Sequence, residues 1–296
     1  MNFKFAAAAL AAALAFTSFS ASAAEIRVQK TDPALNARLP AAVKEAGVIK
    51  NCVTGSFSPY TITRADKSIE GAAMDLTKAL GEVLGVKIET TKIAGHSATM
   101  LGLKSGRFDV AIEPVGDYPD REANYDFIDY VREFVVFAVK KGNPKNLQSL
   151  ADTCGLKVSV MAAGSAERVI KEQSKACVKD GKKPVTVLSF EGQAAPAMAL
   201  TSGRADAFFS SQAPLTYFVS QSGGKLELAA VGKKNGFGDI WQGAVVLKGN
   251  PLGPVLLDGM KVLFENGTYK AVMEKWNLGY NQLEAPGMNL ATAKKN

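Results

Sequence analysis

Two charged residues in one short stretch, Glu113 and Arg121, are able to bind or activate a small charged molecule. They follow a predicted strand at 109–112, in which Asp109 precedes a short apolar run and polar residues stand at the carboxyl end. Ligands of open α/β sheets bind at that end of the strands. A carboxyl group there can pair with a cation or transfer a proton, and a planar guanidinium can hold a carboxylate through two parallel hydrogen bonds.

The core of this stretch occurs twice in the chain. The sequence Ser-Gly-Arg-Phe-Asp-Val at 105–110 is matched by Ser-Gly-Arg-Ala-Asp-Ala at 202–207, and an apolar helical run precedes each copy, at 96–103 and 195–200. In both copies the glycine suits the end of a helix and the aspartate the start of a strand. Two lobes with one supersecondary plan are the simplest explanation, and two chance Ser-Gly-Arg turns are the alternative.

Hydrophobic periodicity places these copies among alternating strands and helices. A strand, a helix and a strand are expected at 48–53, 71–84 and 86–89, and this order predicts a sheet that is parallel at its heart. The β-rich runs 134–139 and 241–248 are predicted to cross between the lobes and to form a hinge. The expected boundaries are 39–135 plus 244–285 for the first lobe, 138–238 for the second lobe and 286–296 for a C-terminal tail.

Length and composition indicate a globular protein of about two domains. The chain has 296 residues, of which 47% are hydrophobic and 21% charged. Its net charge of +7 comes from scattered Lys and Arg residues without interleaved aromatics, which argues against nucleic-acid binding. There is no nucleophile motif and no metal-ligand spacing, so we expect neither a metal nor a cofactor. The single histidine, His96, is expected to cap a helix or to face the surface.

The N-terminus has the form of a secretory signal peptide. Lys4 precedes an Ala-rich apolar run, which ends near the small-residue site Ala21-Ser22-Ala23. We therefore expect residues 1–23 to be removed on export. A retained membrane anchor is the alternative, but the apolar core is short and no lipid-accepting cysteine follows it. No later stretch is apolar for long enough to span a bilayer, so the mature protein is expected to be soluble.

Three cysteines remain in the exported chain. Cys154 and Cys177 flank a helical segment, and we expect an oxidising compartment to join them in a disulfide. Closing a loop of about 24 residues would stabilise the fold by roughly 3.4 kcal/mol on the chain-entropy model. Cys52 is then expected to be a buried thiol in a strand.

Several motifs, in order and spacing, resemble those of the solute-binding proteins of bacterial ABC importers, specifically the polar-amino-acid family (family 3). The resemblance implies an α/β, two-lobed fold of the type II periplasmic-binding-protein kind, in which each lobe is a mostly parallel sheet flanked by helices and two hinge crossovers join the lobes. It also implies a periplasmic monomer without cofactors, which binds an amino acid or analogue and delivers it to ABC transporter permease subunits. The motifs are Ser56-Phe57-Ser58-Pro59-Tyr60, Gly71 with Asp75-Leu76, Ser105 to Asp109, Arg121, Phe127-Ile128-Asp129 and Asn266-Gly267-Thr268-Tyr269 through Trp276.

The same resemblance implies roles for individual residues. Arg121 matches an arginine that holds the ligand's α-carboxylate, and Phe57 matches an aromatic ring that covers the ligand's side chain. Gly164 and Ser165 match a pair that opens a helix, whose free N–H groups and dipole suit a carboxylate. The competing interpretations are a solvated arginine, a core ring and a plain helix cap. The expected ligand-binding residues are Phe57, Tyr60, Glu113, Gly116, Arg121, Gly164, Ser165, Ser211 and Gln212.

The sequence also departs from the family pattern. Ala72-Ala73 stand where an aromatic and an acidic residue are usual, and 113–116 replaces a cluster of hydroxyl residues. Ser211 stands where an aspartate usually pairs with the ligand's ammonium group. Glu113 could supply that negative charge from the opposite lobe, and the alternatives are that it points to solvent or pairs with Arg121.

Two other functions remain open on sequence grounds. The fold also resembles that of secreted cyclohexadienyl dehydratases, in which a carboxylic acid of the cleft protonates a leaving hydroxyl, and Glu113 is the candidate acid. An exported receptor that presents its closed form to a membrane sensor is the third interpretation.

Overall fold

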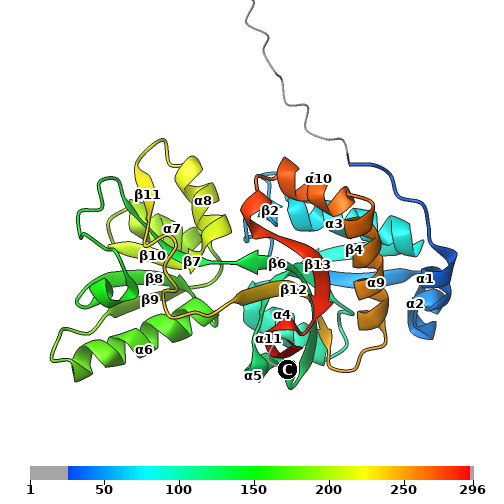
Figure 1. The fold of residues 1–296 in the computed structure, drawn as a ribbon, viewed down its shortest axis with the longest axis horizontal. Helices are drawn as coiled ribbons and strands as arrows, with labels where there is room; N and C mark the ends of the chain where they lie inside the picture. The colour runs from blue at the N-terminus through cyan, green and yellow to red at the C-terminus, as the bar shows by residue number, and fades with distance from the viewer. Residues whose placement is uncertain (1–25, 294–296) are drawn as a thin grey trace, which may run out of the picture.

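The computed structural model describes residues 26–293. The expected signal peptide, 1–23, and the last three residues of the expected tail lie outside this range. Within the described residues the chain forms two lobes joined by extended strands (Figure 1). No helix in this range is both long and apolar enough to cross a membrane.

Lobe 1 contains two main sheets. One is the parallel pair β1 (Val48–Val53) and β4 (Lys87–Lys92). The other is antiparallel and has the order β13-β6-β12-β5, with β5 (Ala111–Asp117), β6 (Tyr125–Glu133), β12 (Ile240–Leu247) and β13 (Gln282–Met288). A parallel bridge between Asn51 and Val110 connects the two sheets. The remaining elements of lobe 1 are β2 (Ile62–Thr63), β3 (Ile69–Glu70), α1 (Pro33–Ala37), α2 (Ala41–Ala46), α3 (Ala72–Leu84), α4 (Gly95–Lys104), α5 (Pro119–Glu122), α9 (Leu252–Glu265), α10 (Thr268–Lys275), η2 (Gly279–Asn281) and α11 (Leu290–Ala293).

The core of lobe 1 forms around α3. Leu76, Leu80 and Leu84 recur on one face of this helix and are almost completely buried. Burying each such side chain stabilises the fold by about 1.5–3 kcal/mol. The helix ends at Gly85, whose φ of 61° is left-handed. Helix α9 crosses α3 closely, because a Cβ atom on Gly259 would lie only 2.6 Å from Leu80 Cδ1.

Lobe 2 contains one mixed sheet with the order β11-β7-β10-β8-β9. Its strands β8 (Lys157–Met161), β9 (Thr186–Phe190) and β10 (Ala207–Ser211) are parallel, as the family resemblance implied for each lobe. Strands β7 (Val135–Lys140) and β11 (Leu226–Ala229) run antiparallel to their neighbours. Each lobe thus contains more antiparallel pairing than expected: lobe 1 has a separate antiparallel sheet, and the lobe 2 sheet is mixed. The connecting strands β7 and β12 contribute to this, because each enters from the other lobe and pairs antiparallel with its neighbours. The remaining elements are η1 (Leu150–Thr153), α6 (Ser165–Lys179), α7 (Ala194–Thr201) and α8 (Gln212–Ser220).

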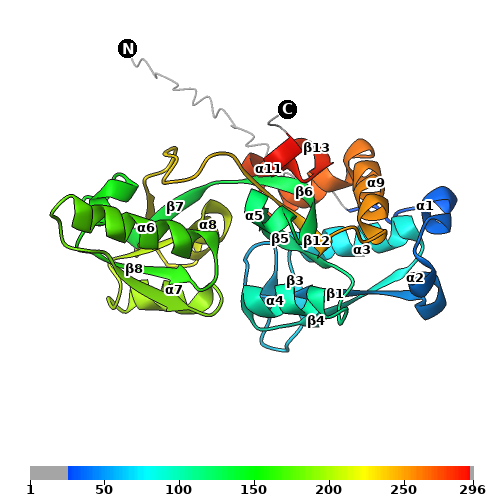
Figure 2. The same cartoon turned by 90° about the horizontal axis from the view of Figure 1, so that it is seen from below.

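Two crossovers join the lobes, as predicted. Strand β6 continues through Phe134 directly into β7, and the chain returns from lobe 2 into β12 (Figure 2). The expected disulfide between Cys154 and Cys177 is present and ties η1 to α6. Cys52 is buried in β1, as predicted.

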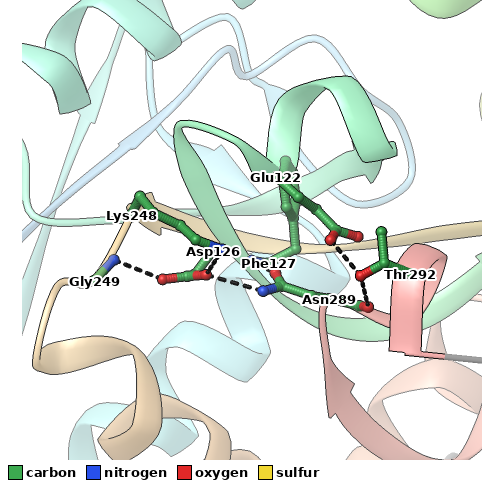
Figure 3. A network of polar contacts seen from close by, with 7 residues as sticks. All are labelled: Glu122, Asp126, Phe127, Lys248, Gly249, Asn289 and Thr292. Carbon is green, nitrogen blue, oxygen red and sulfur yellow. Dashed lines mark hydrogen bonds and ion pairs between the residues drawn. The ribbon is translucent and has the colours of Figure 1, made fainter. Parts of the chain in front are cut away.

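The segment 286–293, which the sequence assigns to a tail, lies on lobe 1. Strand β13 pairs with β6, and the Asn289 side chain bonds two residues of that strand: its Nδ2 donates to Asp126 (2.9 Å) and its Oδ1 accepts from the N–H of Phe127 (2.8 Å) (Figure 3). Thr292 donates to the carboxyl group of Glu122. The C-terminal segment therefore packs on α5 and on the first residues of β6, which follows α5 in the chain.

Candidate functional site

A cavity lies between the two lobes, beside the connecting strands. In this arrangement its free volume is about 40 Å³, which is room for about three water molecules. A ligand of amino-acid size therefore requires the lobes to separate before they close on it. The lining residues are Thr54, Phe57, His96, Glu113, Pro114, Gly116, Tyr118, Arg121, Val135, Met161, Gly164, Ser165, Ala166, Gln193, Ser210, Ser211 and Gln242.

Arg121 brings a positive charge to the lobe 1 wall. It lies in α5, which Pro119 begins, and its Nη1 donates to the carbonyl of Gly116 (2.9 Å). Desolvation lowers the pKa of its guanidinium. Among the described residues no carboxylate oxygen lies within 4.0 Å of the Arg121 guanidinium, the distance of an ion pair. The adjacent Asp120 forms its ion pair with Arg168. A partly buried cation without a counter-ion is a site for an anion.

Glu113 faces the same cavity from β5 and is held by lobe 1 itself. Its carboxyl group accepts the N–H of Thr54 (2.9 Å), the hydroxyl of Thr54 (2.9 Å) and the hydroxyl of Thr61. Glu113 is 4% exposed, and desolvation raises its pKa although these hydrogen bonds oppose the shift. It therefore neither points to solvent nor pairs with Arg121, which excludes both simple alternatives.

Tyr118 connects the two lobes at the edge of the cavity. Its hydroxyl donates to Ser165 Oγ (2.8 Å) at the start of α6. The guanidinium groups of Arg121 and Arg168 lie 5.1 and 5.6 Å from the centre of its ring. Gly116 leaves room for that ring, because a Cβ atom there would lie 2.5 Å from it. These contacts stabilise the closed arrangement of the lobes.

Uncharged polar groups complete the cavity. Ser210 donates to the side-chain oxygen of Gln193 (3.0 Å) in lobe 2. Gln242, in β12, is only 6% exposed, and its Oε1 accepts no hydrogen bond from any described residue. His96 Nδ1 also lacks a partner within this part of the chain, and desolvation, with the nearby Arg121, lowers the pKa of His96 to about 3. The imidazole is therefore neutral at physiological pH.

Seven of the nine residues predicted from the sequence lie around the cavity, and Tyr60 and Gln212 do not. Tyr60 is fully buried and stacks on Phe57 with a centroid distance of 5.4 Å, so the ring packs in the core. Gln212 begins α8, where its N–H donates to the carbonyl of Phe134 (2.7 Å).

The structure adds lining residues that the motifs did not indicate. Tyr118 lies inside the stretch that was singled out, so its proximity to Arg121 was a usable signal. Gln242 lies in the predicted crossover 241–248, where a polar residue inside an apolar run is a signal as well. Gln193 follows a loop without any recognisable motif, and nothing in the sequence pointed to it.

The comparisons with known proteins agree on one family. The description "Bacterial extracellular solute-binding proteins, family 3" matches residues 49–279. The chain is 26% identical over 262 residues to the arginine-binding protein ArgT of Corynebacterium glutamicum, which covers 87% of this chain and 83% of the relative. It is 26% identical over 238 residues to the L-cystine-binding protein TcyJ of Escherichia coli (strain K12), covering 79% and 84%.

A solved structure shows the same fold. An ancestral amino acid-binding protein, AncCDT-1, a precursor of cyclohexadienyl dehydratase, superposes with a TM-score of 0.70 at 24% identity. The match covers 79% of this chain and 97% of that one. The fold is that of the type II periplasmic binding proteins, as the sequence predicted. With a match over most of its length, the chain belongs to family 3 of the bacterial extracellular solute-binding proteins.

Proposed function

We propose that this protein is exported and captures a small amino-acid-like solute with a free carboxylate, which it delivers to an ABC importer. The observation that carries the proposal is Arg121, a partly buried guanidinium that faces the interlobe cavity without a carboxylate partner among the described residues. A ligand carboxylate would complete this charge pair, and the first N–H groups of α6 would add donors on the opposite wall.

The other end of the ligand meets Glu113 and Gln242. Ser211 cannot provide a negative charge, and among the residues that line the cavity the carboxyl group belongs to Glu113. An ammonium group beside Glu113 would favour its ionised form and offset the desolvation that raises its pKa. The Oε1 atom of Gln242 needs a hydrogen-bond donor, which an ammonium or amide group of the ligand supplies.

The relatives support an amino-acid-like ligand without fixing which one. One carries the name of an arginine-binding protein and another that of an L-cystine-binding protein, and both of these ligands have an α-carboxylate and an α-ammonium group. The missing aspartate at Ser211 argues that this chain holds the ammonium group differently, from lobe 1 and the connecting strand.

Thermal-shift screening of amino acids, opines and carboxylates identifies the ligand, because binding to the native state raises the melting temperature. Isothermal titration then compares Arg121→Ala, Glu113→Gln and a control, Arg38→Ala, whose surface ion pair with Asp258 lies away from the cavity. We expect Arg121→Ala to weaken binding by at least about thirtyfold, the effect of removing one partner of a buried charge pair. Unchanged affinity in both cavity variants would refute the proposal that Arg121 and Glu113 bind the ligand.

Catalysis is the second candidate function, because Glu113 is a buried carboxyl group with a raised pKa in the cavity. We propose binding without turnover, since the three hydrogen bonds that Thr54 and Thr61 donate favour the ionised carboxylate over the acid. One acceptor position then remains for a donor of the ligand. Incubation with prephenate or arogenate is expected to give no product. Product formation that Glu113→Gln abolishes would establish the dehydratase instead.

A further inference from the structure

The Ser-Gly-Arg unit that occurs twice in the sequence has the same structure on both lobes. Residues 101–110 end α4 and lead to β5, and residues 198–207 end α7 and lead to β10. The order of buried, intermediate and exposed residues is identical in the two ranges.

The hydrogen bonds of the two units match as well. In each unit the serine hydroxyl donates to a carbonyl three residues earlier, at 3.1 and 3.2 Å. The aspartate accepts the backbone N–H of a lysine on the neighbouring strand, at 2.7 and 2.9 Å. The glycine has a positive φ, 69° and 78°. The folding of a helix end therefore explains the serine, the glycine and the aspartate, but it places no demand on the exposed residues.

The exposed residues of the two units nevertheless match. Leu101 and Met198 occupy the same position and are both 67% exposed, and among the large hydrophobic residues of the described chain only Val28 is more exposed. Arg107 and Arg204 also correspond, and each guanidinium lies over an aromatic ring, at 5.1 and 5.6 Å. Within residues 26–293 no carboxylate oxygen lies within 4.0 Å of either guanidinium, and Asp206, close to Arg204 in the sequence, pairs with Lys145. Each lobe thus presents one apolar side chain and one unpaired cation.

The two units lie on different lobes, close to the contact between them, so the distance between the units changes when the lobes open or close. Figure 2 shows α4 and α7 on the side of the lobes opposite β6 and β7. The first residue of α4, Gly95, approaches the loop before α7 so closely that a Cβ atom there would lie 2.6 Å from Glu191 Oε2. The two helices therefore begin next to each other at the interlobe contact, and opening of the lobes must move the two exposed units apart.

We propose that these two units, defined as Leu101 with Arg107 and Met198 with Arg204, form a two-point docking surface for the paired membrane subunits of the importer. The inference rests on the proposed import function. A surface that repeats the same apolar and cationic groups fits a partner that also repeats one surface, as two like subunits do. Each subunit would offer an apolar pocket next to a carboxylate, and only the closed protein would have the spacing to fill both.

The test uses right-side-out membrane vesicles of the bacterium that encodes this chain and measures saturable binding of the fluorescently labelled protein in the presence of the solute found by thermal shift. Leu101→Asp and Met198→Asp are expected to weaken docking by about tenfold or more each, and the double variant to abolish it. Val178→Asp and Val231→Asp are matched controls, because these residues are 58% and 52% exposed and lie outside both units. The controls are expected to dock within about twofold of the unmodified protein.

Solute affinity and melting temperature of every variant are measured in parallel. Both should be unchanged, since the substituted side chains are exposed and do not line the cavity. The docking surface is refuted by normal docking of the double variant, by an equal loss in the controls, or by no saturable binding of the unmodified protein. Sedimentation that shows Leu101→Asp disrupting a dimer of this chain also refutes it. Solute binding that persists in any of these cases leaves the proposed binding function intact, so the two failures are distinguishable.

Discussion

Replacing Asp117 by Asn should make the stability of this protein less dependent on pH. Asp117 ends β5 and Asp129 lies in β6, and both are almost completely buried. Each accepts one backbone N–H of α11, at 3.0 and 2.9 Å, and each has an Oδ1 atom without a donor among the described residues. Desolvation and mutual repulsion raise the pKa of Asp117, and desolvation raises that of Asp129. One proton held between the two carboxyl groups would satisfy both.

The magnitude follows from proton linkage. In the unfolded chain an aspartate has a pKa of about 3.9, so above pH 5 the pair binds no proton there, whereas the native pair keeps one. Because the native state then binds more protons, the free energy of unfolding falls as pH rises, by about 1.4 kcal/mol per pH unit. From pH 5 to pH 7 the pair costs about 2.7 kcal/mol of stability. An asparagine at position 117 donates a hydrogen bond at every pH and removes this loss.

Urea denaturation of both proteins at pH 5, 6 and 7 measures the effect. Other buried acids such as Glu133, whose pKa burial raises to about 7, give a pH dependence of the same sign in both proteins, so the difference between them isolates the pair. Equal slopes for the original protein and Asp117→Asn would show that the two carboxyl groups share no proton in the native state.

Three further predictions concern contacts that join distant parts of the chain. Asn289→Ala removes two side-chain hydrogen bonds, one of them to a carboxylate, and should lower the free energy of unfolding in chemical denaturation by about 2–4 kcal/mol. Asn289→Gly should lower it less, because the backbone φ of 54° at this position suits glycine better than alanine. Tyr118→Phe removes the interlobe hydrogen bond to Ser165, so small-angle scattering of the ligand-free protein should give a larger radius of gyration and an unchanged one would contradict the expectation. Cys154→Ser with Cys177→Ser should cost about 2–4 kcal/mol in stability without a change in solute affinity, since neither residue lines the cavity.

Local signals in the sequence predicted most of the fold. The repeated Ser-Gly-Arg unit is set by short-range helix-end and strand-start contacts, so its recurrence directly indicated two lobes of one plan. The antiparallel pairings were not predictable in this way, because β12 and β13 reach their places through contacts between residues more than one hundred positions apart, such as Gly243 with Asp129. A short segment such as 286–293 has no periodicity of its own, and long-range hydrogen bonds place it on lobe 1.

The cavity was predictable to the extent that motifs fix side-chain direction. A motif located Phe57 and Tyr60 in one turn, but which ring faces the cavity depends on the packing of the whole lobe. The hydroxyl partners of Glu113, Thr54 and Thr61, flank that same turn, and their role follows only from the close approach of β1 to β5, where Asn51 bridges Val110. Residues brought together by tertiary packing therefore escaped the sequence reasoning.

The C-terminal segment contacts the residues on both sides of Arg121 in the candidate ligand site. A helix of four residues, as α5 is, has too few internal hydrogen bonds to hold its own conformation. Its neighbours hold it instead: the N–H of Ala291 binds Asp117 before the helix, and Thr292 binds Glu122 inside it. Arg121 lies between these two anchors. The direction of its guanidinium, and with it the position of the proposed carboxylate, therefore depends on Ala291 and Thr292, which follow it by about 170 positions.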